Sequence, residues 1–144
     1  MLAIGSDHGG YELKNHVIKH LEELGIEYKD CGCYSEDSVD YPDIAQQVCA
    51  EIKSGNCKNG ILICGTGIGI SIAANKIDGI RAALCSDVYS ATMTRRHNDA
   101  NVLCMGGRVL GRELAFSIVD AFLIAEFEGG RHQNRIDKIH ALEK

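Results

Sequence analysis

The sequence predicts an α/β protein built around a five-stranded parallel sheet. Short apolar runs alternate with longer amphipathic segments along the chain, and every connection between two apolar runs is long enough for a crossover helix. Five or six helices are expected between and after the strands. The expected strands read MLAIG, EYKDC, GILIC, RAALC and NVLCM, at residues 1–5, 27–31, 60–64, 81–85 and 101–105.

The first helix is expected directly after the first strand. Leu13, Val17, Leu21 and Leu24 follow one another at spacings of four, four and three residues, which is the spacing of one helix face. Gly25 comes next, and glycine is the residue that most often ends a helix at the C′ position. The pattern therefore predicts that this helix stops at Gly25.

The last segment differs from the repeating units before it. Gly129 and Gly130 are expected to end one helix, and a further C-terminal helix follows them. That helix places Ile136, Ile139 and Leu142 on a narrow apolar face, which needs a covering surface. The same domain or a second subunit would serve, and the sequence leaves both open.

Bulk composition bounds the function. The chain has 144 residues, so we expect a single domain, residues 1–144. A formal charge of −5 argues against a nucleic-acid surface. No run approaches the roughly 18 apolar residues of a membrane span, and the N-terminus lacks a signal-peptide pattern, so no membrane partner and a cytoplasmic location are expected. Seven cysteines without a CxxC pair suit a reducing compartment.

Polar residues that directly follow the strands are the first candidates for function. In open parallel sheets, ligands bind outside the carboxyl ends of the strands. This rule selects Asp7 and His8 after the first strand, the segment 64–69 after the third, and Asp87 after the fourth. It also includes the segment SVDYP, residues 38–42, before the second long helix.

The segment CGTGIGIS carries the strongest local signal. Gly65, Gly67 and Gly69 would let backbone N–H groups converge on an anion at a helix N-terminus, although a plain tight turn is the simpler alternative. The spacing is G-x-G-x-G, which departs from the dinucleotide pattern G-x-G-x-x-G, even though Asp87 lies near the place of a ribose-binding acid. No Lys-Ser or Lys-Thr follows, which excludes a P-loop. An anion smaller than a nucleotide fits best.

Cys64 and Thr66 add chemistry to this loop. A thiol at a strand end that faces a helix N-terminus is placed to form a thiolate, which serves as a base or nucleophile. A core cysteine is the alternative, as for Cys85 and Cys104. A base beside an oxyanion cradle suits proton abstraction next to a carbonyl group.

The basic residues indicate a phosphorylated substrate. Arg131 and Arg135 lie one helical turn apart and would project together toward a phosphate, and Arg108 would join them. A solvated basic surface is the alternative for each.

Four of the six histidines form two groups. His8 and His97 stand in motif-like settings. His16 and His20 are four residues apart on the first helix but lack a third ligand, so we interpret both as surface residues and expect no metal site.

Five strings together identify a family resemblance. SDHGG, DYPD, CGTGIGISIAANK, RRHNDANVL and EGGRHQNR resemble, in order and over nearly the whole chain, the ribose-5-phosphate isomerase B family. The resemblance implies a Rossmann-like three-layer αβα sandwich and a homodimer whose active sites use residues of both subunits. It further implies interconversion of ribose 5-phosphate and ribulose 5-phosphate in the non-oxidative pentose phosphate pathway, without a metal or organic cofactor.

The resemblance also implies roles for single residues. Cys64 matches the family's catalytic base, Thr66 matches the hydroxyl that moves a proton between sugar oxygens, and His97 matches the residue that opens the furanose ring. One branch of the family lacks the cysteine and uses a glutamate at the position of Ile70. Because isoleucine has no acid–base group, the role of base falls to Cys64 here.

The remaining matches are to residues that hold the substrate. The enediolate is surrounded by the backbone nest of Gly65, Thr66, Gly67, Ile68, Gly69, Ile70 and Ser71. The sugar is contacted by Asp7, Tyr41 and Asn98, and the phosphate is held by His8, Arg108, Arg131 and Arg135. Two alternatives stay open: a six-carbon substrate, allose 6-phosphate or galactose 6-phosphate, and a non-catalytic nucleotide-binding module.

Overall fold

The sheet of the computed structural model is parallel throughout, and among the described residues, 1–143, it has five strands in the order β2-β1-β3-β5-β4. Each strand bound lies within one residue of its expected position. Lys144, the last residue of the expected domain, lies outside the described residues. The strands are β1 (Leu2–Ser6), β2 (Tyr28–Asp30), β3 (Asn59–Cys64), β4 (Ala82–Leu84) and β5 (Val102–Gly106).

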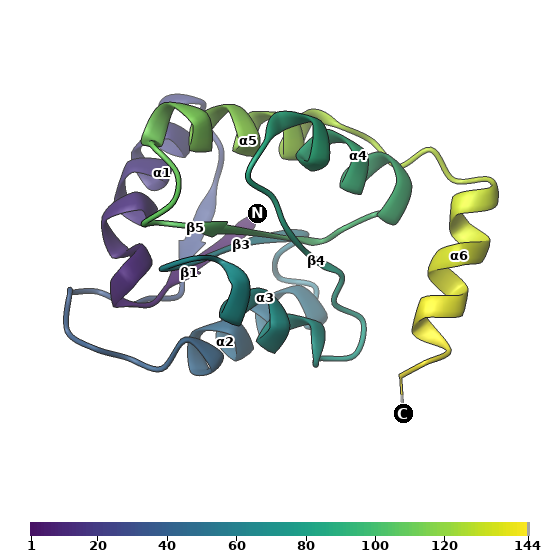
Figure 1. The fold of residues 1–144 in the computed structure, drawn as a ribbon, viewed down its shortest axis with the longest axis horizontal. Coiled ribbons are helices and arrows are strands. Elements are labelled where there is room, and N and C mark those ends of the chain that lie inside the picture. The colour runs from purple at the N-terminus through teal and green to yellow at the C-terminus, as the bar shows by residue number, and fades with distance from the viewer. Residues whose placement is uncertain (144) are drawn as a thin grey trace.

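Helices cover both faces of the sheet, as the predicted three-layer αβα sandwich requires (Figure 1). One face carries α1 (Tyr11–Glu23), α4 (Val88–Asn98) and α5 (Arg112–Ile124), and the other carries α2 (Tyr41–Lys53) and α3 (Ile68–Asn75). A short 3-10 helix, η1 (His8–Gly10), links β1 to α1. The predicted fold class is confirmed.

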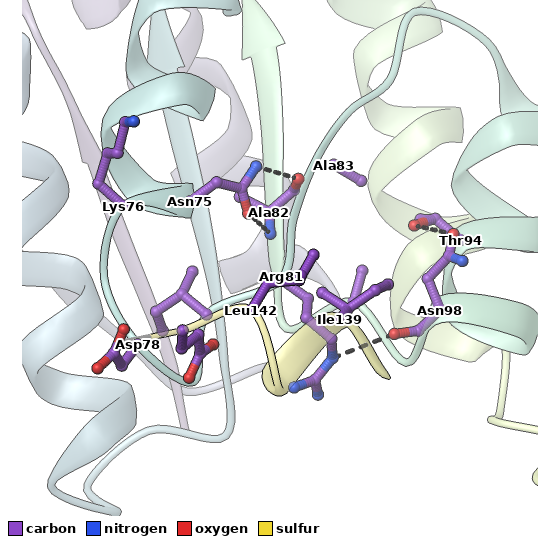
Figure 2. Close-up of a pocket in the computed structure, with 13 residues that line it drawn as sticks. Asn75, Lys76, Asp78, Arg81, Ala82, Ala83, Thr94, Asn98, Ile139 and Leu142 are labelled. Carbon is purple, nitrogen blue, oxygen red and sulfur yellow. Dashed lines mark hydrogen bonds between the residues drawn. The ribbon is translucent and has the colours of Figure 1, made fainter. Parts of the chain in front are cut away.

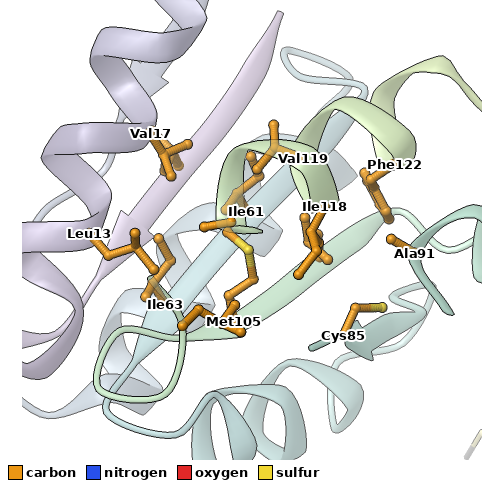
Figure 3. Packing of buried hydrophobic residues seen from close by; sticks show 14 of the residues in the cluster. Leu13, Val17, Ile61, Ile63, Cys85, Ala91, Met105, Ile118, Val119 and Phe122 are labelled. Carbon is orange, nitrogen blue, oxygen red and sulfur yellow. The ribbon is translucent and has the colours of Figure 1, made fainter. Parts of the chain in front are cut away.

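The sequence of the central strand β3 is continuously apolar because both faces of the strand are buried. Ile61 and Ile63 point into the cluster under α1 and α5, where they meet Met105 and Val119 (Figure 3). Leu62 points into the opposite cluster, under α2 and α3. A strand buried on both faces has no solvent side, so it shows no polar alternation.

The first helix ends as predicted. Leu13, Val17 and Leu21 are buried, α1 ends at Glu23, and Gly25 follows with φ +72°. Leu24, the fourth residue of the predicted stripe, is exposed.

His20 departs from its interpretation as a surface residue. Its ring stacks on Phe116 of α5 with centroids 4.4 Å apart, and its Nε2 lies 2.7 Å from Oδ1 of Asp120. The contact joins α1 to α5 across 100 positions of sequence, which local spacing does not reveal.

The prediction for Gly129 and Gly130 was wrong about the helix before them. Helix α5 ends at Ile124, because Ala125 already adopts an extended backbone with ψ 143°. The backbone N–H of Glu128 then donates to the carbonyl of Arg96, so the connecting segment runs against the end of α4. The two glycines, with φ +69° and +58°, instead lead into the next helix.

The C-terminal helix α6 (Arg131–His140) lies beside the sandwich and next to α4 (Figure 1). Ile136 is buried, whereas Ile139 is half-exposed and Leu142 is 77 % exposed. The predicted apolar face is therefore only partly covered within the described chain. Among residues 1–143, no helix has the length and apolar character that crossing a membrane requires.

Candidate active site

Three loops meet at the carboxyl ends of β1, β3 and β5. The N–H of Asp7 donates to the carbonyl of Ile63 at 3.2 Å, and the N–H of Gly107 donates to the carbonyl of Cys64 at 2.8 Å. A Cβ on Gly107 would lie 2.7 Å from the carbonyl oxygen of Gly9. β2 is added on one side of β1 and β3 on the other, so the strand order reverses between β1 and β3, and open α/β sheets bind ligands at such a point.

Asp7 and His8 are fixed at this edge by backbone contacts. Asp7 is buried, and its Oδ1 accepts from the N–H groups of Gly9 and Gly10 at 2.9 and 3.2 Å. Nδ1 of His8 accepts from the N–H of Val39 at 3.3 Å, so Nε2 is the nitrogen that remains for a ligand.

The glycine loop brings the thiol of Cys64 to the N-terminus of α3. Cys64 is the last residue of β3, its side chain is 4 % exposed, and its Sγ accepts from the N–H of Gly67 at 3.1 Å. Gly67 has φ +83°, and a Cβ there would lie 2.7 Å from the backbone of Met105. Only glycine fits this turn, which explains the residue at the centre of CGTGIGIS.

Further backbone donors lie at the start of α3, close in sequence to the thiol. Oγ1 of Thr66 accepts from the N–H of Ile68 at 3.1 Å, so the exposed Thr66 hydroxyl also lies at the helix start. The first N–H groups of a helix have no carbonyl partner within it, and those of Gly69 and Ile70 belong to this set. The helix N-terminus favours negative charge at the same place. The loop can therefore hold an oxyanion beside a thiol.

Ile70 can contribute only its backbone N–H to this nest, whereas the N–H of Ser71 already donates to the carbonyl of Gly67 at 3.2 Å. The Ile70 side chain is fully buried in the cluster under α2 and α3, and Oγ of Ser71 donates to the carbonyl of Ile68 at 2.7 Å. Neither side chain is free to contact a ligand.

Tyr41 and Arg108 close the sides of the loop. A Cβ on Gly69 would lie 2.7 Å from the Tyr41 hydroxyl, so the phenol covers the helix start. A Cβ on Gly65 would lie 3.4 Å from Nη1 of Arg108, whose own N–H donates to the Gly65 carbonyl. A pocket of about 560 Å³ adjoins Tyr41 and His8 and continues along residues 38–43.

A second group of predicted residues lies near the amino ends of the strands, away from the thiol. It consists of His97, Asn98, Arg131 and Arg135. His97 and Asn98 end α4, and the chain enters β5 at Val102, at the amino end of the strands. Cys64 pairs with Gly106 at the carboxyl end of β5, which is roughly 13 Å further along the strand. Within one chain, the structure does not bring His97 to Cys64.

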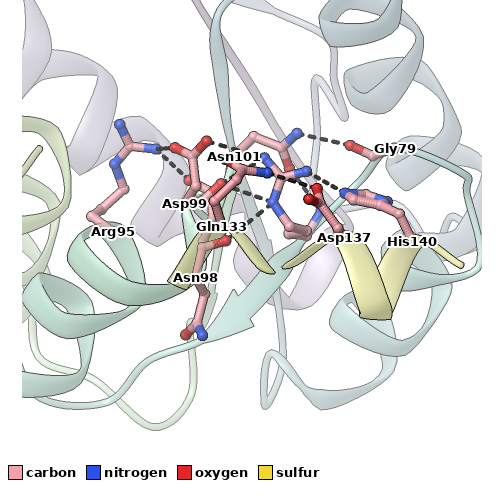
Figure 4. A network of polar contacts seen from close by, with 10 residues as sticks. Gly79, Arg95, Asn98, Asp99, Asn101, Gln133, Asp137 and His140 are labelled. Carbon is pink, nitrogen blue, oxygen red and sulfur yellow. Dashed lines mark hydrogen bonds and ion pairs between the residues drawn. The ribbon is translucent and has the colours of Figure 1, made fainter. Parts of the chain in front are cut away.

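Contacts around Arg81 hold this second group together. Nε of Arg81 donates to the carbonyls of Asn98 and Asp99, and its Nη1 lies 2.8 Å from Nε2 of His140 on α6 (Figure 4). The end of α4 is thereby tied to α6, which carries the exposed Arg131 and Arg135.

A pocket also lies at the amino ends of the strands, away from the thiol. It has a volume of about 780 Å³ and opens between the end of α3, β4, the end of α4 and α6 (Figure 2). Asn98 lines it together with the apolar Ile139 and Leu142. The rest of the candidate site is absent from its lining.

Sequence reasoning missed Glu128 and His132. His132 is buried and stacks on His97 with centroids 4.2 Å apart, and Glu128 lies near both rings. Both residues stand inside the string EGGRHQNR, but only its arginines were singled out.

Comparison with known proteins decides the family. A sequence profile described as Ribose/Galactose Isomerase matches residues 2–139. The chain belongs to this ribose/galactose isomerase family. It is 54 % identical to ribose-5-phosphate isomerase B of Escherichia coli, over 99 % of this chain and 96 % of that protein.

Solved structures of the ribose/galactose isomerase family superpose closely. The structure of Clostridium thermocellum ribose-5-phosphate isomerase B matches with a TM-score of 0.97 and 55 % identity, over 98 % of this chain and 95 % of that one. The type B enzyme of Trypanosoma brucei matches with a TM-score of 0.95 and 46 % identity, over 99 % and 97 %. The predicted family is confirmed.

Proposed function

We propose that this protein interconverts ribose 5-phosphate and ribulose 5-phosphate. The observation that carries the proposal is the Cys64 thiol at the end of β3, which accepts a hydrogen bond from the Gly67 N–H just before the start of α3. Full-length relatives named ribose-5-phosphate isomerase B support the substrate.

The reaction begins with opening of the furanose ring. The bond between C1 and the ring oxygen O4 breaks, the C1 hydroxyl loses its proton, and O4 gains one, which leaves an aldehyde. His97 assists these proton transfers. Asp7, Tyr41 and Asn98 contact the sugar hydroxyls.

Proton transfer between C2 and C1 follows. The Cys64 thiolate removes the C2 proton, the released electron pair forms the C1–C2 double bond, and the aldehyde oxygen becomes the enediolate oxygen. The backbone donors left free in this loop, which include the N–H groups of Gly69 and Ile70, stabilise that charge. The Thr66 hydroxyl moves a proton from O2 to O1, and Cys64 returns its proton to C1 to complete the ketose.

We further propose that the active site is shared between two subunits of a homodimer. Within one chain, the thiol of Cys64 lies at the carboxyl ends of the strands, and a second set of predicted residues lies near their amino ends. One chain therefore cannot bring both sets to one sugar. The second set consists of His97, Asn98, Arg131 and Arg135. A second copy would bring its second set to the thiol, and its arginines would hold the phosphate together with His8 and Arg108.

An exposed apolar surface supports this association. It comprises exposed apolar side chains of α3, of the edge strand β4, of the start of α4, where Tyr89 is 72 % exposed, and of the C-terminal end of α6. Large exposed apolar patches are typical of protein interfaces. The residues of this surface are Ile68, Ile72, Leu84, Val88, Tyr89, Ile139 and Leu142.

We also propose that the enzyme is cytoplasmic, that it needs no cofactor, and that each subunit has one domain. All seven cysteines are free, which suits a reducing compartment. The mechanism uses only side chains and backbone donors of the protein, so we expect full activity after extensive dialysis against EDTA.

A coupled assay with purified protein tests the substrate. Turnover of ribose 5-phosphate should exceed that of allose 6-phosphate and galactose 6-phosphate. A clear preference for a six-carbon sugar phosphate would contradict the proposed substrate and would indicate a hexose-phosphate isomerase, in keeping with the galactose part of the family description. Thermal stabilisation by mononucleotides but not by sugar phosphates would instead favour a non-catalytic nucleotide-binding module.

A further inference from the structure

Glu128 lies near two histidines, His97 at the end of α4 and His132 at the start of α6. Its Oε1 lies 3.6 Å from Nε2 of His97 and 3.6 Å from Nε2 of His132. Both distances exceed a hydrogen bond, but catalytic hydrogen bonds are often long without substrate and shorten in the complex.

The carboxylate is held in this orientation from the other side. Its Oε2 lies 2.9 Å from Nε of Arg96 in an ion pair, and the Glu128 N–H donates to the Arg96 carbonyl at 3.0 Å. Arg96 is the neighbour of His97 on the last turn of α4. Glu128 is therefore fixed to the same turn that carries His97, with one oxygen left for the rings.

His132 fixes the plane of the His97 ring. The two rings stack with centroids 4.2 Å apart and an angle of 11° between their planes. Burial, and then the nearby His97 and Arg131, lower the pKa of His132 below its usual range. A ring that stays neutral at pH 7 can pack against His97 without repelling its protonated form.

We propose that Glu128 and His132 are positioning residues for His97 in the ring-opening step. The stack sets the ring plane, and the carboxylate attracts the proton on Nε2, which leaves Nδ1 as the nitrogen that exchanges a proton with the sugar. This inference rests on the proposed function, because ring opening is required only of a substrate that cyclises.

The same three side chains offer a metal site, since their ligand atoms lie within 4.8 Å of one another. The geometry favours positioning instead. Nearly parallel rings direct their in-plane lone pairs side by side, whereas two imidazole ligands of one metal must converge on a point. Arg96 also occupies the second carboxylate oxygen and places a positive charge beside the site.

The two directions of the reaction separate ring opening from the later steps. Ribose 5-phosphate closes to a furanose through O4, but ribulose 5-phosphate stays open because its C5 oxygen carries the phosphate. We expect Glu128→Gln to lower the initial kcat with ribose 5-phosphate roughly tenfold and that with ribulose 5-phosphate less than about twofold. Glu126→Gln, an exposed glutamate of the same segment, is the matched control and should change neither rate.

Two substitutions of His132 complete the test. His132→Ala should give the same split between directions, and His132→Phe, which keeps a ring under His97, should restore most of the loss. An equal loss in both directions, or no loss in either, would overturn the proposal. If EDTA abolishes wild-type activity and Zn²⁺ restores it, the three side chains bind a metal and the positioning role is wrong. Wild-type protein inactive on both pentose phosphates would reject the proposed function itself.

Discussion

The backbone N–H of Gly67 donates to Sγ of Cys64 at 3.1 Å, at the first turn of α3. The contact fixes the position of Sγ beside the helix start, where backbone dipoles favour negative charge. The backbone turn that exposes donors to a substrate thus also prepares the base.

Cys64→Ala should therefore lose turnover and keep binding. A general base typically contributes a rate factor of about 10² to 10⁴ and little ground-state affinity, so kcat should fall by that factor while the Kd for sugar phosphate stays within about twofold. Initial rates and calorimetric titration measure the two quantities. Cys57→Ala, a buried cysteine before β3, is the control and should keep wild-type kcat. Near-normal turnover of Cys64→Ala would remove this thiol from the mechanism.

Gly67→Ala should damage both stability and activity. Its φ of +83° strains any other residue, and the new Cβ would lie 2.7 Å from the backbone of Met105. Gly79→Ala has nearly the same φ, +85°, and no atom within 4 Å, so it isolates the conformational cost of about 1–2 kcal/mol. Urea unfolding should show a larger loss for Gly67→Ala, together with at least a tenfold drop in kcat. Equal losses for the two variants would mean that the loop yields without strain.

Arg131→Ala and Arg135→Ala should chiefly raise KM. A hydrogen bond to a charged group contributes about 1.5–3 kcal/mol, and a phosphate contact persists from ground state to transition state, so KM should rise roughly tenfold or more. Lys138→Ala on the same helix is the matched control. If the arginine variants slow an unphosphorylated sugar equally, their role is structural.

Stability should fall in alkali because of buried thiols. Burial raises the pKa of Cys31, Cys49 and Cys85 to about 11, from a usual value of 9.0. Between these values the unfolded chain loses protons that the folded protein keeps, so the free energy of unfolding decreases as pH rises from about 9 to about 11. The slope is at most about 1.4 kcal/mol per pH unit for each thiol. Urea unfolding of Cys49→Ala/Cys85→Ala should show a flatter slope, and an unchanged slope would assign the effect to other groups.

Much of the fold could be predicted because its signals are local. The continuous apolar run of β3 indicates a strand buried on both faces, and Gly25 ends α1 where the sequence places it. Gly129 misled because a glycine with positive φ serves equally after one helix or before the next. The contact between His20 and Asp120 spans 100 positions, and no local pattern carries it.

The candidate site was predictable for the same reason, and only in part. The loop that carries Cys64 lies in one stretch of chain, so its chemistry can be read from spacing. Glu128 and His132 are only four residues apart, but their approach to His97 depends on how α6 and the segment before it pack against α4, which sequence spacing does not give. The family string contained these residues without indicating what they do.

Cys64 lies at the carboxyl ends of the strands, whereas His97 lies at the end of α4, near their amino ends. We therefore propose, as the central claim, that each active site takes these two residues from different subunits. Cys64→Ala and His97→Ala should each be nearly inactive with ribose 5-phosphate. Equal amounts, briefly denatured and refolded together, should form about half mixed dimers, each with one intact site of two, and restore about a quarter of wild-type activity. If mass spectrometry finds mixed dimers and activity stays at the level of the separate variants, the shared-site account is wrong.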